Sequence, residues 1–196
     1  MYVVLAEDKS DVNCLRILIK LLAKNESLTV EGKGFNSCGN MLNKGAAYLK
    51  LYNEQDKFYK FIICHDRDKN SSQDIYKKVV SKIINNAKLK PEKLICILIP
   101  TEEIEAWILA DIKAVSNILS WQPKQEFYNP EEIESPKEKL IKLARLDKSI
   151  YIHNIHNEKV MKYLDLTIVK KKCPSFAELA NFVENDIANY PIRNSK

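Results

Sequence analysis

The sequence predicts an α/β protein with a parallel sheet of about four strands flanked by helices, because short apolar runs alternate with longer segments of helical periodicity. Four such runs occur in the first 120 residues, and the alternation then stops. With 196 residues, 45% of them hydrophobic, the chain is long enough to bury a core of ordinary size. We expect an α/β core over residues 1–120 and a helical C-terminal extension over residues 121–196, packed on that core.

The expected strands are compact apolar runs, except that the second is interrupted by Gly32 and Gly34. They cover residues 2–6, 28–35, 58–64 and 94–99. The last of these runs is almost wholly apolar, which is typical of a strand that helices cover on both faces. The sequence therefore favours a sheet in the interior of the core.

Helices should fill the intervals between these strands, because parallel strands require crossover connections. Ser10 is the expected N-cap of the first helix, and apolar residues at helical spacing continue it to about residue 24. Further helices are expected up to about residue 52, after residues 70–72, and as one long helix over residues 100–119. In the extension, we expect an irregular stretch over residues 121–135 and then the helices 136–146, 156–165 and 174–189.

The overall charge and the cysteines narrow the class of protein. The chain has 31 basic and 26 acidic residues, a net charge of +5, which permits a polyanionic partner without requiring one. Its five cysteines are odd in number and none is in C-x-x-C spacing, so we expect reduced thiols and a cytoplasmic location. No apolar run approaches the roughly 20 residues of a membrane span, and no signal peptide is evident.

Acidic residues follow three of the four expected strands. Glu7 follows the first strand, Asp66 and Asp68 follow the third, and Glu105 lies beyond the fourth. Because the carboxyl ends of parallel strands share one edge of a sheet, these acids should lie near one another. Two such charges 4 Å apart repel by about 4 kcal/mol at an effective dielectric constant near 20. A hard cation such as Mg²⁺, which binds oxygen ligands, would remove that repulsion.

Structural roles are the alternative for each of these acids. Glu102 and Glu103 would be favoured in the first turn of the long helix by the helix dipole. Asp66 and Asp68 could form a turn or cap a helix, and Glu105 could belong to a solvated helix face.

Three segments together resemble the Toprim domain. Glu7 followed by Asp11 resembles its first motif, typically V-E-G-x-x-D, and Asp66-Arg67-Asp68 resembles its second. Residues 103–111, E-I-E-A-W-I-L-A-D, are similar to the E-x-E-A-W-x-L-A-D signature of small stand-alone Toprim-like proteins, relatives of the overcoming-lysogenization-defect-type nucleases. The resemblance covers most of the chain. It implies a Toprim-like, Rossmann-like sheet and a metal-dependent nuclease, with some relatives encoded in phage-defence cassettes.

The resemblance also implies roles for individual residues. Glu7 would be a general acid/base or a metal ligand, and the catalytic Asp66 and Asp68 would hold Mg²⁺ or Mn²⁺. Asp11 would bind a second ion. Glu105 is expected as a further metal ligand because the strand pattern brings it to the same edge. One residue departs from the pattern, because Asp8 stands where the first motif usually has glycine.

Cations beside these acids are the expected contacts to nucleic acid. Lys9, Arg67 and Lys69 could bind phosphates, and the alternative for each is a solvated surface cation. The chain has no P-loop, so any ATPase activity must belong to a partner protein.

Two other classes of function stay open at this point. The start V-V-L-A-E-D also resembles a response-regulator receiver domain, in which Asp66 would accept phosphate and Thr101 would mimic the receiver hydroxyl. That interpretation gives Asp68 no role and lacks a convincing fifth strand. The other alternative is a non-catalytic Toprim-type module that binds nucleic acid or a protein.

Overall fold

The core of the protein is a four-stranded parallel sheet with the strand order β2-β1-β3-β4. The structure is a computed structural model that describes residues 1–190 except 56, 58, 68–69 and 91–92. The strands are β1 (Tyr2–Ala6), β2 (Val30–Gly34), β3 (Lys60–Cys64) and β4 (Leu94–Leu98). Each lies within or at the predicted run, so the predicted α/β class with a helical C-terminal region is confirmed.

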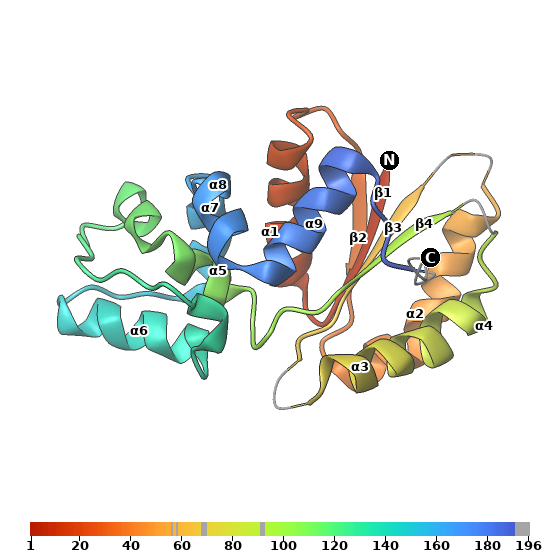
Figure 1. Cartoon of the computed structure of the whole chain (residues 1–196), viewed down its shortest axis with the longest axis horizontal. Helices are drawn as coiled ribbons and strands as arrows, with labels where there is room; N and C mark the ends of the chain where they lie inside the picture. Colours follow the sequence, from red (N-terminus) through yellow and green to blue (C-terminus); the bar gives the residue numbers. More distant parts are fainter. Residues whose placement is uncertain (56, 58, 68–69, 91–92, 191–196) are drawn as a thin grey trace.

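Two layers of helices cover the sheet (Figure 1). One layer contains α2 (Cys38–Asn53), α3 (Ser72–Val79), the π-helical turn η1 (Val80–Ile84) and α4 (Asn85–Ala87). The other contains α1 (Lys9–Leu22) and the last helix, α9 (Pro174–Asn185). Alternate residues of β1 divide between the two cores: Val3 and Leu5 pack on the α2 side, and Val4 and Ala6 on the α1 side.

The remaining helices form a cluster beyond α1 (Figure 1). This cluster contains α5 (Glu105–Ala110), the 3₁₀ turns η2 (Ile112–Asn117) and η3 (Pro130–Glu132), α6 (Pro136–Leu146), α7 (His153–Met161) and α8 (Leu166–Lys172). Its apolar residues belong to the same continuous core as α1, α9 and one face of the sheet. Within the described residues, no helix is long and apolar enough to cross a membrane.

The prediction of one long helix over residues 100–119 is wrong. Residues 100–104 are not helical, and all six residues of α5 are buried, so this segment has no solvent-facing side. The helix ends at Asp111, whose backbone has φ −128° and ψ 61°. There the Asp111 carboxylate accepts a hydrogen bond from the Asp165 backbone N–H at 2.8 Å, and the Lys172 ammonium donates to the Ala110 carbonyl at 2.9 Å. At this point the chain forms contacts with α8 and its N-cap Asp165, and α5 does not continue.

The E-I-E-A-W-I-L-A-D segment connects the sheet to the C-terminal helices. Glu103 binds Lys137 at the start of α6, through an ion pair at 2.8 Å and a bond from the backbone N–H at 3.1 Å. The Trp107 indole donates to Ser175 at the start of α9, at 3.0 Å. Together with Asp111, these side chains join residues 103–111 to α6, α8 and α9, so much of this signature has a structural role.

Candidate functional site

The strand order makes the carboxyl ends of β1 and β3 the topological switch point of the sheet, the position of the crevice in open α/β folds. From the central strand β1 the chain first crosses to β2 on one side and later returns to β3 on the other. In open α/β sheets, ligands bind at such a switch point. Glu7 directly follows β1 and Asp66 lies two residues after β3, so the structure places both predicted residues at the crevice.

The turn after β1 is fixed by a capping box, which also positions Asp11. The Asp8 carboxylate accepts bonds from the backbone N–H groups of Ser10 and Asp11, and the Asp11 carboxylate accepts one from the Asp8 N–H. Asp8, and not Ser10 as predicted, is therefore the N-cap of α1. Its backbone is extended, with φ −131° and ψ 176°, so glycine is not needed here. Its negative charge is engaged in capping.

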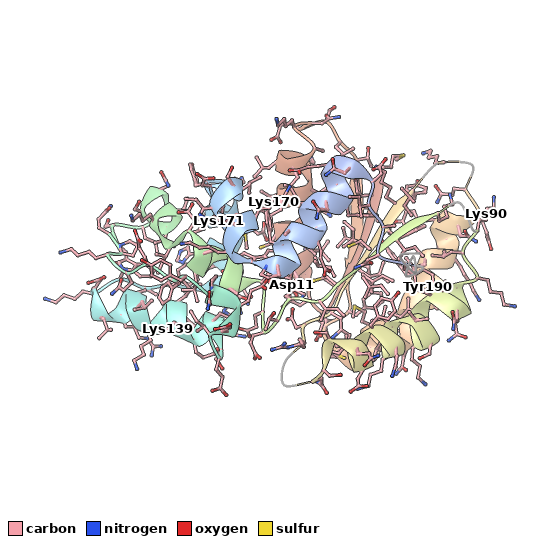
Figure 2. The ribbon with its side chains drawn as sticks, in the orientation of Figure 1. Asp11, Lys90, Lys139, Lys170, Lys171 and Tyr190 are labelled. Carbon is pink, nitrogen blue, oxygen red and sulfur yellow. The ribbon has the colours of Figure 1, made fainter. Side chains whose placement is uncertain are left out.

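Four carboxyl groups interact at this edge of the sheet. The pKa of Asp66 is raised well above its usual range, first by burial and then by the negative charges of Asp11, Glu7 and Glu105. The pKa of Asp11 is raised to about 8 by burial, Asp8, Glu105 and Glu7. Figure 2 shows Asp11 near the middle of the molecule, between the sheet and the C-terminal helices. Each of these charges raises the pKa of its neighbours, as we expect for acids that lie at one edge of the sheet.

Glu105 enters the site from the side of α5. It is buried, with 6% of its surface exposed, so the solvated helix face considered above is wrong. Its carboxylate accepts a hydrogen bond from the Asn157 amide at 2.9 Å, and Asn157 in turn accepts one from the Tyr151 hydroxyl at 2.7 Å. Burial raises the pKa of Glu105, while the bond from Asn157 opposes that rise. This chain of buried bonds fixes the direction of the Glu105 side chain.

The residues predicted to contact nucleic acid differ in their exposure and in their partners. Lys9 is exposed in the first turn of α1. Arg67 is half-buried and forms an ion pair with Glu102, with 3.7 Å between its Nη2 and the Glu102 Oε1. The predicted metal ligand Asp68 and the predicted phosphate contact Lys69 lie outside the described residues.

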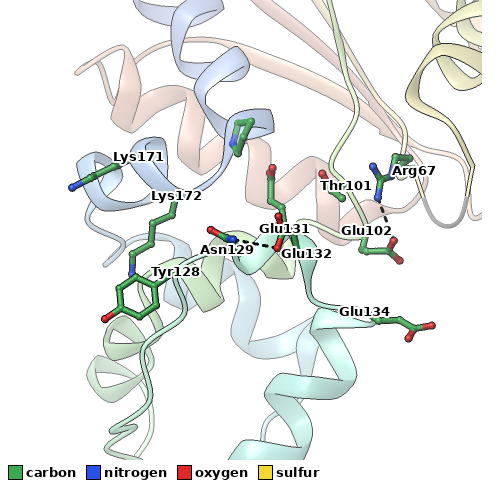
Figure 3. Close-up of a pocket in the computed structure, with 11 residues that line it drawn as sticks. Arg67, Thr101, Glu102, Tyr128, Asn129, Glu131, Glu132, Glu134, Lys171 and Lys172 are labelled. Atoms are coloured by element: carbon green, nitrogen blue, oxygen red, sulfur yellow. Dashed lines mark hydrogen bonds and ion pairs between the residues drawn. The ribbon is translucent and has the colours of Figure 1, made fainter.

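A cavity of about 810 Å³ opens beside Arg67 (Figure 3). It continues from the ends of β3 and β4 to Tyr128, Lys171 and Lys172 in the C-terminal helical cluster. Acids also line it, among them Glu102 and Glu131, so its charge is mixed. The four clustered carboxyl groups are not part of this lining.

Sequence reasoning missed two further polar residues at the crevice, Cys38 and His65. The Cys38 Sγ lies 2.9 Å from the His65 Nε2, and the His65 Nδ1 lies 2.7 Å from the Asp66 carbonyl oxygen and 3.5 Å from a Glu7 oxygen. His65 directly precedes Asp66 at a strand end, which was an available signal. No sequence signal pointed to Cys38. It begins α2, 27 residues before His65, and only the packing of that helix brings the two side chains together.

Comparisons with known proteins give one result. Searches of curated proteins and of solved structures found no match to this chain. Residues 6–184 match the family described as "Domain of unknown function (DUF4276)". That match includes β1-terminal Ala6, the acidic crevice and the helical extension through α9. Because it covers most of the chain, the protein belongs to the DUF4276 family.

Proposed function

We propose that this protein is a metal-dependent nuclease that hydrolyses phosphodiester bonds in DNA or RNA. The observation that carries the proposal is the convergence of Glu7, Asp11, Asp66 and Glu105 at the switch point of the sheet, with raised pKa values for the last three. Perturbed acids in a crevice are typical of functional sites. The resemblance to the Toprim motifs supports the same reaction class.

The donor set fits Mg²⁺ or Mn²⁺. Carboxylate oxygens are the ligands that these hard cations favour, and a cation would neutralise the repulsion that raises the pKa of Asp66 and Asp11. We assign Asp66 and Asp11 as ligands, with Glu105 held toward them by Asn157. Asp68 stays a predicted ligand. A bound divalent cation would polarise a phosphoryl oxygen and lower the pKa of a water molecule.

The protein's own side chains supply proton transfer and substrate placement. Glu7 lies at the end of β1 with 22% of its side chain exposed, so it can take a proton from an attacking water or hold a metal. Arg67 borders the cavity of Figure 3 and can bind a phosphate of the substrate backbone. The exposed Lys9 can bind a second phosphate on the α1 side, and Lys69 stays a predicted contact.

The compartment and the biological role are parts of the same proposal. All five cysteines are in the thiol form, which supports the reducing cytoplasm as the compartment. Defence against phage, with an ATPase partner protein, is supported only by the resemblance. Both belong to the proposal.

The receiver-domain alternative has less support. Within the described residues the parallel sheet ends at β4, whose far edge is covered by Asn189 and by an antiparallel bridge between Ile95 and Tyr190. The position of a fifth parallel strand is thus occupied by a C-terminal segment. Incubation with a phosphodonor distinguishes the two functions, because aspartyl phosphate on Asp66 would exclude the nuclease.

A cleavage assay tests the proposal directly. Panels of DNA and RNA are incubated with the protein in Mg²⁺, in Mn²⁺ and in EDTA. We expect cleavage with either metal and none in EDTA. Glu7→Gln and Asp66→Asn should each reduce the rate by at least roughly 100-fold, a conservative figure for groups that act in the chemical step.

Folding and specificity are controlled in the same assay. Asp66→Asn removes a carboxyl that the fold holds at unfavourable cost, so its melting temperature in EDTA should not fall. Glu54→Gln, an exposed change at the end of α2, should cleave like wild type. Cleavage that survives both Glu7→Gln and Asp66→Asn would show that these residues are not the site. Absence of cleavage on every substrate would instead favour the non-catalytic module.

A further inference from the structure

Cys38, His65 and Glu7 form a second polar group at the crevice, different in chemistry from the carboxyl cluster. One potential ligand atom from each lies within 4.8 Å of the other two. They come from three elements: Glu7 follows β1, Cys38 begins α2 and His65 follows β3. A thiol, an imidazole and a carboxylate at such distances match the donor types of a zinc site.

The hydrogen bonds of His65 prepare it as a ligand. A backbone carbonyl can only accept a hydrogen bond, so the Nδ1 that lies 2.7 Å from the Asp66 carbonyl carries the ring hydrogen. In the neutral ring this leaves the lone pair on Nε2, the atom that faces the Cys38 sulfur at 2.9 Å. Histidines that bind metals are commonly oriented by such a bond from the other ring nitrogen.

Cys38 has both the access and the electrostatic setting of a ligand. The other four cysteines are buried and Cys38 is partly exposed, so among the five, all within the described chain, it is the accessible thiol. It occupies the first position of the 16-residue helix α2, where the helix dipole favours a negative charge. Only 4% of the surface of His65 is exposed. An ion could therefore enter from the Cys38 side.

We propose that Cys38, His65 and Glu7 form a site for Zn²⁺, and that zinc bound there inhibits the nuclease by withdrawing Glu7 from the carboxyl cluster. Thiolate and imidazole favour zinc over Mg²⁺, whereas an all-carboxylate cluster favours the harder ion. The two neighbouring sites would thus select different metals and compete for one residue. Only the inhibition rests on the proposed function; zinc binding stands without it.

Zinc binding requires a small rearrangement. With Zn–S near 2.3 Å and Zn–N near 2.0 Å, tetrahedral ligands stand roughly 3.5 Å apart, which is wider than the 2.9 Å between Cys38 and His65. Rotation of the partly exposed Cys38 side chain can supply this change, and the Glu7 carboxylate, which lies 3.5 Å from the His65 Nδ1, must turn toward the Nε2 side. Binding releases the thiol proton to solvent, and water fills the fourth position.

Cobalt spectroscopy tests the site without any assay of activity. The metal-stripped full chain is titrated with Co²⁺, and we expect one ion per chain to give a thiolate-to-cobalt charge-transfer band that Zn²⁺ abolishes. Cys38→Ser should eliminate the band. His65→Asn, which keeps a donor for the Asp66 carbonyl but removes Nε2, should weaken binding by more than roughly 100-fold, beyond the usual loss of an outer partner. Cys173→Ser, at the start of α9, should behave like wild type.

A cobalt complex without the thiolate band, or a band that persists in Cys38→Ser, would overturn the zinc site. Rapid alkylation of Cys38 in a chain that binds no Co²⁺ or Zn²⁺ would also overturn it, because the pair would then be a hydrogen-bonded thiol and imidazole only.

Inhibition is tested by adding Zn²⁺ to the Mg²⁺-dependent cleavage reaction. We expect wild type to lose activity at about one equivalent of zinc, while Cys38→Ser keeps its Mg²⁺-dependent rate and resists zinc by at least about tenfold in concentration. Equal inhibition of both proteins would place the zinc effect at the carboxyl cluster and overturn this mechanism. If neither protein cleaves any substrate, the proposed function fails, and the cobalt titration still decides the zinc site.

Discussion

At the level of single residues, Asp11 couples the stability of the protein to pH. Its pKa of about 8 exceeds the ordinary value of 3.8, so the folded chain binds this proton more tightly than the unfolded chain does. The stability that this proton contributes is fully present below about pH 4 and is lost as the pH rises toward 8. A cation bound by Asp11 would have the opposite pH dependence, because it requires the ionised carboxylate.

We therefore expect Asp11→Asn to stabilise the metal-free protein at pH 9. The amide oxygen can still accept the bond from the Asp8 N–H, while the repelled charge is removed. The gain in the free energy of unfolding should be about 1–2 kcal/mol. This is less than the whole pKa shift would give at about 1.4 kcal/mol for each pKa unit, because the carboxyl is partly exposed and solvent screens its charge. Thermal melts in EDTA should show a rise of roughly 3–6 °C at pH 9 and little difference at pH 5. An equal gain at both pH values would contradict the raised pKa.

Asn157 makes the second prediction at this scale. It is 1% exposed and joins the Glu105 carboxylate to the Tyr151 hydroxyl. Asn157→Ala leaves both groups buried without this partner, which should cost about 1–3 kcal/mol in the free energy of unfolding, measured by urea denaturation. It should also reduce the stabilisation by Mg²⁺, since Glu105 loses its orientation.

Asn154→Ala is the matched control for Asn157→Ala. Asn154 lies on the same helix, α7, but is exposed, so its replacement should change stability by less than about 0.5 kcal/mol. Equal effects of the two changes would indicate that the helix, and not the buried bonds, accounts for the loss.

At the level of elements, the sequence predicted the strands well and the helix ends less well. The runs that became β1, β3 and β4 are almost wholly apolar and buried, as strands covered by helices on both faces are, whereas β2 at the sheet edge, V-E-G-K-G, is partly exposed. The division of residues 100–119 into α5 and η2 was not predictable, because it depends on contacts of Asp111 and Ala110 with α8. Contacts between residues distant in the sequence leave no local pattern.

The same reason explains which part of the site was predictable. Glu7 and Asp66 are each adjacent to a strand end, so the strand pattern alone brings them to one edge. The contact of Cys38 with His65 depends on how α2 packs after the crossover from β2 to the far side of β1. The burial of Glu105 likewise depends on α7, which begins 48 residues later in the chain.

Gly34, at the end of β2, supports the turn that carries Glu7 and Asp8. A Cβ at this position would lie 2.4 Å from the Asp8 carbonyl carbon and the Lys9 backbone nitrogen, neither of which can rotate away. Gly34→Ala should therefore displace the turn and cost about 1–3 kcal/mol, as overpacking commonly does. We expect a lower urea midpoint and a smaller gain in melting temperature on addition of Mg²⁺.

Gly39→Ala provides the contrast to Gly34→Ala. It lies in the first turn of α2, and a Cβ there would meet no atom within 4 Å. Alanine is favoured over glycine in helices by about 0.5–1 kcal/mol, so this variant should be as stable as wild type or more stable. If Gly34→Ala were equally harmless, the close approach of β2 to the turn would not be a constraint on the site.

At the level of the whole molecule, the C-terminal helices complete the core of the sheet. The hydrophobic cluster on the α1 side contains Trp107, Trp121, Leu140 and Phe176 together with Val4 of β1. The α9 residue Phe182 packs edge to face on Tyr2 of β1, with ring centroids 6.2 Å apart. A unit that folds alone needs a core of its own, and here one sheet face depends on residues beyond 120.

We therefore expect the fragment 1–120 not to fold alone. Without α9 the part of this sheet face that α9 covers, including Tyr2 and the α1-side residues of β4, would be exposed to water. The fragment should show no cooperative thermal transition by circular dichroism, should bind a hydrophobic dye and should aggregate, as chains with exposed cores do. Co-expression with residues 121–196 should restore a soluble complex with a cooperative transition. A sharp transition in the fragment alone would instead show that the sheet and its nearest helices are sufficient, and that the acidic crevice can form without α7 and Asn157.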